Sequence, residues 1–202
     1  MKAIHVSQLS HLSDEDLMEK LQNGTMPAFD LLVSRYKDRL HNFLFRYTQN
    51  HEDCEDLVQE TFLRVYRSRD SYQRIARFST WMYTIALNLA KSMYKKKQRM
   101  STYSIHADPE DSDDREMLIE DTNILQDEEL HQKLSIQELE KALLKLNEDF
   151  REVIVLRDIQ ELSYEEIVDI TGVAMGTVKS RINRARIQLQ EMIGEYVKSE
   201  TF

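Results

Sequence analysis

The residues best suited to chemistry lie near the C-terminus, where a predicted helix from residue 175 to about residue 196 presents a polar and basic face. Arginine and asparagine read base edges in the major groove of DNA, whereas threonine, serine and lysine contact phosphates. No acidic residue occurs between Ala174 and Glu191. At about 100° per residue, the outward arc and its flanks hold Thr177, Lys179, Ser180, Asn183, Arg184, Arg186 and Ile187. This face favours binding to duplex DNA.

The residues around this helix predict how it is positioned. Ser163 and Glu166 form a capping box, S-x-x-E, that begins a short helix ending at Gly172. The turn that follows has the length found in helix-turn-helix motifs. The inward arc of the last helix is apolar and consists of Val178, Ile182, Ala185 and Leu189. The alternative is a solvated basic helix in a bundle, which would require the cap, the turn and the acid-free face to coincide by chance.

A second cationic helix is predicted from about residue 79 to residue 99. Its basic residues alternate with aromatic ones, a pattern that suits melted nucleic acid because bases stack on rings while lysines follow the backbone. The expected core face is Met82, Ile85, Ala86, Leu89 and Met93. The opposite face and its edges hold Thr80, Trp81, Thr84, Leu87, Asn88, Lys91, Tyr94 and Lys95. The alternative is that Phe78 and Trp81 belong to the core and the lysines only favour a helix C-terminus.

The stretch DLVQETFLRVYR, residues 56–67, predicts an amphipathic helix of a different kind. Val58, Phe62, Val65 and Tyr66 share the arc that a core would take. The opposite arc is charged and holds Asp56, Glu60, Leu63 and Arg67. A leucine among charges is either an isolated surface residue or the apolar anchor of a docking site.

The sequence offers no catalytic or metal-binding arrangement. There is no Ser/His or Cys/His constellation, no phosphate-binding loop and no dinucleotide fingerprint. His51 and Cys54 have the spacing of a ligand pair, but zinc requires four ligands and no second pair is evident. We therefore expect a buried thiol, no cofactor and no enzyme activity.

These faces are carried by a chain that we predict to be entirely α-helical. It contains four glycines and two prolines in 202 residues, which leaves few tight turns. Two helices are expected within residues 13–48, with Ser13 as the first N-cap, and a third over 52–69. Helical periodicity returns at residue 135 and continues to the last helix. The prediction is two small helical domains joined by a linker.

The charge distribution supports this division. The formal net charge is −9, but residues 64–99 carry 10 basic and 1 acidic side chains, and residues 108–130 carry 1 basic and 11 acidic ones. Because screening limits a field to about 8 Å at physiological salt, the net charge does not exclude DNA. The acidic stretch is read as a linker, either a solvated spacer or a segment with a partner. No apolar run approaches a membrane span and no signal-peptide core is present, so we expect a cytoplasmic protein without membrane insertion.

Taken together, the motifs resemble those of bacterial RNA polymerase sigma factors of the extracytoplasmic-function (ECF) type. The strings D-L-x-Q-E-x-F, F-x-T-W-x-Y-x-I-A-x-N and G-T-V-K-S-R-x-x-R-A-R carry the resemblance. It implies a sigma region 2 domain at residues 14–100, an acidic linker at 101–134 and a helix-turn-helix sigma region 4 domain at 135–198. Residues 1–13 form an N-terminal extension that matches nothing assigned, and the linker is unusually acidic for the family.

The resemblance also implies the site residues and partners. The core-polymerase contacts would be Asp56, Gln59, Glu60 and Leu63. The contacts to the melted −10 element would be Tyr72, Gln73, Arg74, Ile75, Ala76, Arg77, Thr84, Asn88, Lys91 and Lys95. The contacts to the duplex −35 element would be Thr177, Lys179, Ser180, Asn183, Arg184 and Arg186. The partners would be the β′ clamp helices and β flap of core RNA polymerase, promoter DNA and an anti-sigma factor, which could hold the protein at the membrane.

Two rival interpretations remain open from the sequence. An ordinary helix-turn-helix regulator with a sensing or dimerising N-terminal domain would bind duplex DNA, usually a palindrome, without polymerase. A helical adaptor that binds only proteins would show no salt-dependent affinity for DNA.

Overall fold

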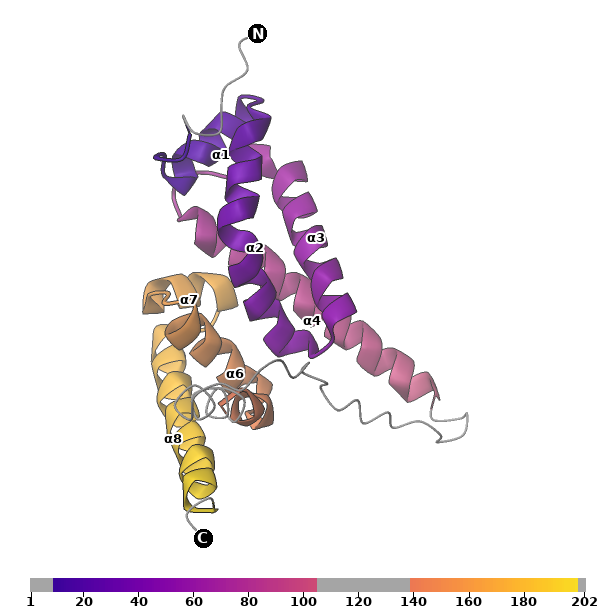
Figure 1. The fold of residues 1–202 in the computed structure, drawn as a ribbon, viewed down its shortest axis with the longest axis vertical. Coiled ribbons are helices and arrows are strands. Elements are labelled where there is room, and N and C mark those ends of the chain that lie inside the picture. Colours follow the sequence, from indigo (N-terminus) through magenta and orange to yellow (C-terminus); the bar gives the residue numbers. More distant parts are fainter. Residues whose placement is uncertain (1–8, 105–138, 200–202) are drawn as a thin grey trace, which may run out of the picture.

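The structure is a computed structural model that describes residues 9–104 and 139–199. The described residues form helices and connecting turns without a β-strand (Figure 1). The first eight residues, the predicted linker beyond Ser104 and the predicted start of the second domain at 135–138 lie outside the described residues. Within the described parts, the all-helical prediction is confirmed.

The first described part is a helical bundle with the predicted order of elements. Ser13 caps the first helix, where its hydroxyl accepts a hydrogen bond from the Asp16 amide. The last helix of this part is longer than predicted, because it continues through the first four residues assigned to the linker. The elements are α1 (Asp14–Gln22), α2 (Met26–Thr48), α3 (His51–Arg67), the 3-10 turn η2 (Arg69–Ser71) and α4 (Phe78–Ser104).

The second described part contains the helix-turn-helix. Its elements are a helical segment at residues 139–145, α6 (Glu148–Ile154), the π-helical turn η3 (Val155–Ile159), α7 (Tyr164–Thr171) and α8 (Met175–Ser199). The capping box forms as predicted, with Ser163 and Glu166 each accepting the other's backbone N–H. Gly172 has φ +70°, the left-handed conformation that glycine tolerates at a helix end. The predicted inward residues of α8 are all buried.

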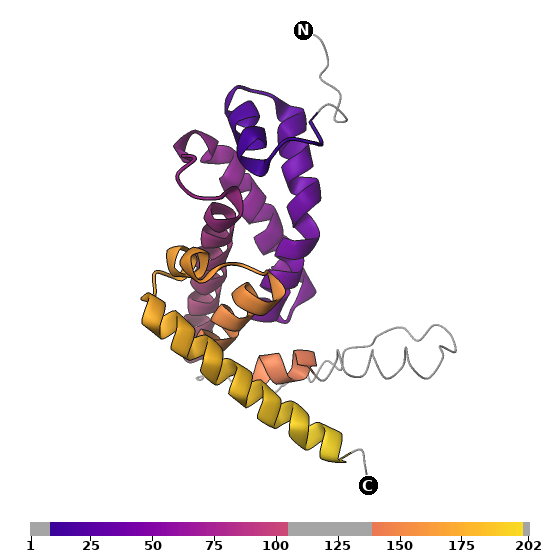
Figure 2. The ribbon, with the colours of Figure 1, turned by 90° about the vertical axis from the view of Figure 1, so that its left-hand side faces the viewer.

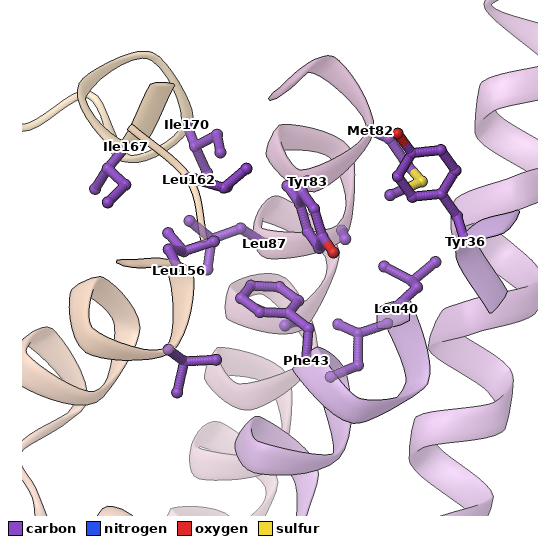
Figure 3. Close-up of a cluster of buried hydrophobic side chains, with 14 of the residues drawn as sticks. Tyr36, Leu40, Phe43, Met82, Tyr83, Leu87, Leu156, Leu162, Ile167 and Ile170 are labelled. Carbon is purple, nitrogen blue, oxygen red and sulfur yellow. The ribbon is translucent and has the colours of Figure 1, made fainter. Parts of the chain in front are cut away.

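The two parts share one hydrophobic core in this conformation. Figures 1 and 2 show α7 against α4, with α8 on the outer side of the second part. Figure 3 shows buried residues of the two parts side by side. Within the first part, the rings of Phe43 and Tyr83 lie edge to face at an angle of 73°. The labelled residues of the first part are Tyr36, Leu40, Phe43, Met82, Tyr83 and Leu87, and those of the second are Leu156, Leu162, Ile167 and Ile170.

Across residues 9–104 and 139–199, no helix combines the length and the apolar character that a membrane span needs.

Candidate functional site

The outer face of α3 is open to solvent. Asn50 caps this helix by accepting a hydrogen bond from the Asp53 amide at 3.0 Å. Phe62 and Val65 are buried as predicted, while Val58 and Tyr66 pack at the edge of the core. Cys54, Leu57 and Thr61 complete the buried side.

The exposed side of α3 is an acidic face with an apolar centre. Asp56 and Gln59 are exposed, and Leu63 retains 46% of its accessible surface. Glu60 is half-buried and accepts a charge-assisted hydrogen bond from Arg64 at 2.9 Å, although a surface pair of this kind adds only about 0.3–0.5 kcal/mol to helix stability. We call Asp56, Gln59, Glu60 and Leu63 the α3 face, and it is available to a partner.

The loop between α3 and α4 presents some of its predicted contact residues and uses others internally. Gln73, Arg74, Ile75 and Arg77 are exposed. Tyr72 is buried instead, and its hydroxyl donates a hydrogen bond to the backbone carbonyl of Ala76 at 2.9 Å. The Tyr72 side chain therefore shapes the loop from inside and cannot stack on a base in this conformation.

The predicted outward face of α4 is partly covered. Asn88 and Lys95 are exposed, but Thr80 and Leu87 are buried, with 3% and 1% of their surface accessible, and Thr84 is half-buried. The outward placement of Thr80 and Leu87 was therefore wrong for this conformation. The physical reason is that α7 packs against this side of α4 and extends the hydrophobic core across it.

Polar contacts between the two parts surround this apolar contact. The Tyr83 hydroxyl donates to the Gln160 side-chain oxygen at 2.5 Å. Glu166 accepts from the Thr80 hydroxyl at 3.3 Å and lies 3.5 Å from the Arg77 guanidinium. The part of α4 that carries the predicted −10 residues is thus held by the helix-turn-helix part.

An ion pair with a buried carboxylate joins Lys91 of α4 to Glu152 of α6. The lysine Nζ lies 2.9 Å from Glu152 Oε2, and only 2% of the glutamate surface is accessible. Burial raises the pKa of Glu152, and the hydrogen bond from Lys91 opposes this shift by favouring the carboxylate. Sequence reasoning missed Glu152, since a glutamate in an amphipathic helix is expected to face solvent.

The polar face of α8 remains accessible. Thr177, Lys179, Ser180, Asn183 and Arg184 are all exposed. They stand on a helix whose opposite side is fixed in the core, which presents them as one rigid surface.

Arg186 is also exposed, but it is already paired with a carboxylate. Its guanidinium binds both oxygens of Asp158, at 3.0 and 2.6 Å. A phosphate would have to compete with that bidentate pair. Among the predicted α8 contacts that the structure describes, Arg186 is the one with an acidic partner at hydrogen-bond distance.

The single cysteine behaves as a buried thiol. Cys54 Sγ contacts the His41 carbonyl oxygen at 3.4 Å, and no group of three or more potential metal ligands occurs among the described residues. Burial raises the pKa of the Cys54 thiol to about 11.

This burial predicts slow thiol chemistry. Because the thiolate is the nucleophile, labelling of Cys54 at pH 8 should be about 100-fold slower in the native protein than in the unfolded chain. A disulfide-exchange reagent followed by absorbance, with and without urea, measures both rates. Equal rates would contradict the buried position of the thiol.

Comparisons with known proteins match both described parts. Residues 32–100 match the model of Sigma-70 region 2, and residues 136–189 match that of Sigma-70, region 4. The chain is 36% identical to the ECF RNA polymerase sigma-E factor of Haemophilus influenzae, over 90% of this chain and 96% of that protein. It is 35% identical to the ECF RNA polymerase sigma-E factor of Escherichia coli K12, over 93% and 97%.

A solved structure of similar fold is that of the sigma factor RpoE in complex with the anti-sigma factor NepR from Bartonella quintana. It shares 30% identity with a TM-score of 0.65, over 82% of this chain and 96% of that one. The structure of CnrH in complex with the cytosolic domain of CnrY has a TM-score of 0.66 at 24% identity, over 90% and 97%, and shows likeness of fold.

Proposed function

Since this chain belongs to the RNA polymerase sigma factors of the ECF type, we propose that it serves core RNA polymerase as a non-catalytic specificity subunit in the cytoplasm. It recruits the polymerase to promoters, reads their −10 and −35 elements and supports strand opening. The observation that carries this proposal is the intact helix-turn-helix whose recognition helix, α8, exposes an acid-free polar face.

We assign the −35 contact to that face. Asn183 and Arg184 offer hydrogen bonds to base edges, while Thr177, Lys179 and Ser180 suit phosphates. Arg186 joins them once it leaves Asp158. The first residues of α8 also present backbone N–H groups toward an approaching phosphate.

We assign the −10 contact to α4 and the loop before it. The exposed candidates there are Gln73, Ile75, Asn88 and Lys95, with Arg74 exposed but paired with Asp16 at 2.7 Å. Residues covered or shared with the second part become available when that part moves away: Arg77, Thr84 and Lys91 belong to this group. Tyr72 and Ala76 support the loop, because the Tyr72 hydroxyl donates a hydrogen bond to the Ala76 carbonyl oxygen.

The closed arrangement differs from the arrangement that a promoter requires. Positions −10 and −35 are about 25 base pairs apart, or about 85 Å of duplex at roughly 3.4 Å per base pair. In the structure, Thr80 of α4 and Glu166 of α7 are 3.3 Å apart. Both halves can bind one promoter only after α7 and α8 separate from α4.

The polymerase contact is assigned to the α3 face. Leu63 provides an apolar anchor, and Asp56, Gln59 and Glu60 suit arginines on a partner such as the β′ clamp helices. The β flap is the proposed partner of the second part. A relative of 30% identity was solved with the anti-sigma factor NepR, and we propose that a protein of this class binds the present chain and can hold it at the membrane.

A transcription assay tests the function. Purified protein is mixed with core polymerase and a genomic promoter library, and transcripts are sequenced. We expect initiation at a set of promoters that share −10 and −35 elements. Binding to palindromic duplex DNA without polymerase would support an ordinary regulator. A lack of promoter-specific initiation, together with no salt-dependent DNA affinity of the chain itself, would support a protein-only adaptor.

Arg184→Ala tests the −35 assignment. We expect the affinity of the holoenzyme for a cognate −35 duplex to fall by roughly 1–3 kcal/mol, and specificity at one base pair to relax. Titration by fluorescence anisotropy against matched and mutated duplexes measures both. Arg181→Ala is the control, because Arg181 lies on the same helix but pairs with Asp149 at 2.6 Å. Equal losses in the two variants would contradict the assignment.

A further inference from the structure

The loop that joins α3 to α4 is held by α1 at three points. At its start, the Gln22 side-chain amide donates to the carbonyl oxygens of Arg69 and Tyr72, at 2.8 and 3.0 Å. In its middle, the Arg74 guanidinium donates to Asp16 at 2.7 Å. These contacts bridge 47 to 58 positions of sequence, so they fix the loop from outside.

The third point lies where the loop enters α4. The Phe78 backbone N–H, one of the first amides of that helix, donates to the Glu15 carboxylate at 3.0 Å. A helix N-terminus favours such an anionic partner. The loop is therefore restrained at its start, its middle and its end by one short helix that precedes the region matched to Sigma-70 region 2.

Inside the loop, Tyr72 completes the restraint. Its ring centroid lies 5.2 Å from that of Trp81 and 6.3 Å from that of Phe78. Its hydroxyl binds the Ala76 carbonyl. The Gln22 amide donates to the backbone carbonyl of this same residue. Gln22 therefore positions the Tyr72 ring against Trp81 and Phe78.

The outer side of the loop carries an apolar side chain that is exposed to solvent. Ile75 is 88% exposed, more than any other large hydrophobic residue that the structure describes. One exposed isoleucine alone needs no explanation. On a loop whose backbone is already ordered, however, an apolar tip binds without the entropy cost of ordering the chain.

We propose that α1 is a brace that preorganises the α3–α4 loop for base selection, with Gln22 as the main positioning residue and Ile75 at the selecting tip. This inference rests on the proposed function, because it takes the unpaired −10 strand as the ligand. A rigid loop rejects a base that does not fit, whereas a loose loop repacks around several bases. Loosening the brace therefore lowers discrimination between bases more than it lowers binding of the preferred one.

The test uses the full chain with the isosteric change Gln22→Glu, which removes the amide donor and places an acceptor opposite two carbonyls. Lys20→Ala, at an exposed position of the same helix, is the control. In the free protein, polarised fluorescence of Trp81, the single tryptophan of the chain, reports order at the Tyr72 contact. In the holoenzyme, forked promoter DNA carrying each of the four bases at each −10 position gives the affinity ratio of best to worst base.

We expect Gln22→Glu to increase Trp81 mobility and to reduce the affinity ratio about five- to thirtyfold, the effect of freeing roughly one backbone residue. Core polymerase affinity should match that of Lys20→Ala. Asp16→Asn, a change at the loop's second anchor, should reduce the ratio in the same direction and serves if Gln22→Glu does not fold.

Three outcomes would overturn the inference. An unchanged ratio in both variants means that the brace does not select bases. An equal loss of affinity for all four bases means that Gln22 has a general structural role. Unchanged Trp81 mobility means that there is no brace. If the wild-type holoenzyme shows no base preference at any −10 position, the proposed function of the loop fails, and the Trp81 measurement still decides whether α1 orders it.

Discussion

Leu63→Glu is expected to abolish detectable binding of core RNA polymerase without unfolding the protein. Leu63 is 46% exposed at the centre of the α3 face, where an apolar side chain is framed by Asp56, Gln59 and Glu60. Truncation of an interface anchor alone typically costs about 2 kcal/mol or more, which is about 30-fold in affinity. The carboxylate would in addition be desolvated without a partner, so we expect the total loss to exceed this value.

Size-exclusion co-elution and a titration with labelled core enzyme measure this loss. Met26→Glu is the matched control, because Met26 is 45% exposed but lies on α2. The thermal midpoints of both variants should stay close to that of the wild type, since neither residue is in the core. Co-elution of Leu63→Glu with wild-type affinity would place the polymerase contact elsewhere.

The second large effect is expected for Glu152→Lys, which reverses the charge of the glutamate buried against Lys91. Two lysines would then face each other where Glu152 is buried and Lys91 is 35% exposed. Breaking a fully buried pair typically costs about 3–5 kcal/mol, so we expect about 2–3 kcal/mol for this half-buried one. The free energy of unfolding should fall by this amount, or the two halves should separate and relieve the repulsion. Urea unfolding measures the first result and small-angle X-ray scattering the second.

The charge-swapped double variant, Lys91→Glu with Glu152→Lys, controls for the loss of packing. It restores opposite charges across the same contact and should recover most of the stability and the compact scattering profile. A single variant that is both as stable and as compact as the wild type would show that the Lys91–Glu152 pair does not hold the halves together.

Local features of the fold could be predicted because local chemistry determines them. Ser13, Ser163 and Gly172 each form a hydrogen bond with a backbone group three or four residues away at a helix end. Helix caps of this kind can therefore be predicted from the local sequence. The inward arc of α8 and the exposed leucine of α3 follow from helical periodicity alone. The exposed faces of α3 and α8 were accordingly predicted from spacing.

The covered part of α4 could not be predicted in the same way. A helical wheel divides a helix into one core face and one free face, but α4 packs on two sides. Leu87 carried a hint, since it is apolar within a face read as polar, yet nothing nearby in the sequence identifies α7 as its partner. The burial of Glu152 was harder still to predict, because its ion-pair partner Lys91 is 61 residues away in the sequence.

The sequence predicted a loop before α4, but it did not predict which side chains of the loop are buried or what they bind. Tyr72 was expected among the DNA contacts, whereas its ring lies in the core and its hydroxyl closes the loop. The contacts from Gln22 and Asp16 span long stretches of chain and depend on how α1 docks. Such pairings follow from tertiary packing, which one sequence does not specify by pattern alone.

The shared core also has a thermodynamic consequence for competition among sigma factors. Only the free chains whose two parts have separated are competent to form the promoter-bound holoenzyme. The apparent dissociation constant of that complex therefore equals the intrinsic constant divided by the fraction of separated chains. If roughly 1% of the chains are separated, the apparent affinity is about 100-fold weaker than the intrinsic affinity. A ligand that binds across the junction would deepen this penalty and act as an inhibitor at a distance from the α3 face. By linkage, the factor by which such a ligand weakens binding of the promoter-bound holoenzyme is also the factor by which formation of that complex weakens binding of the ligand.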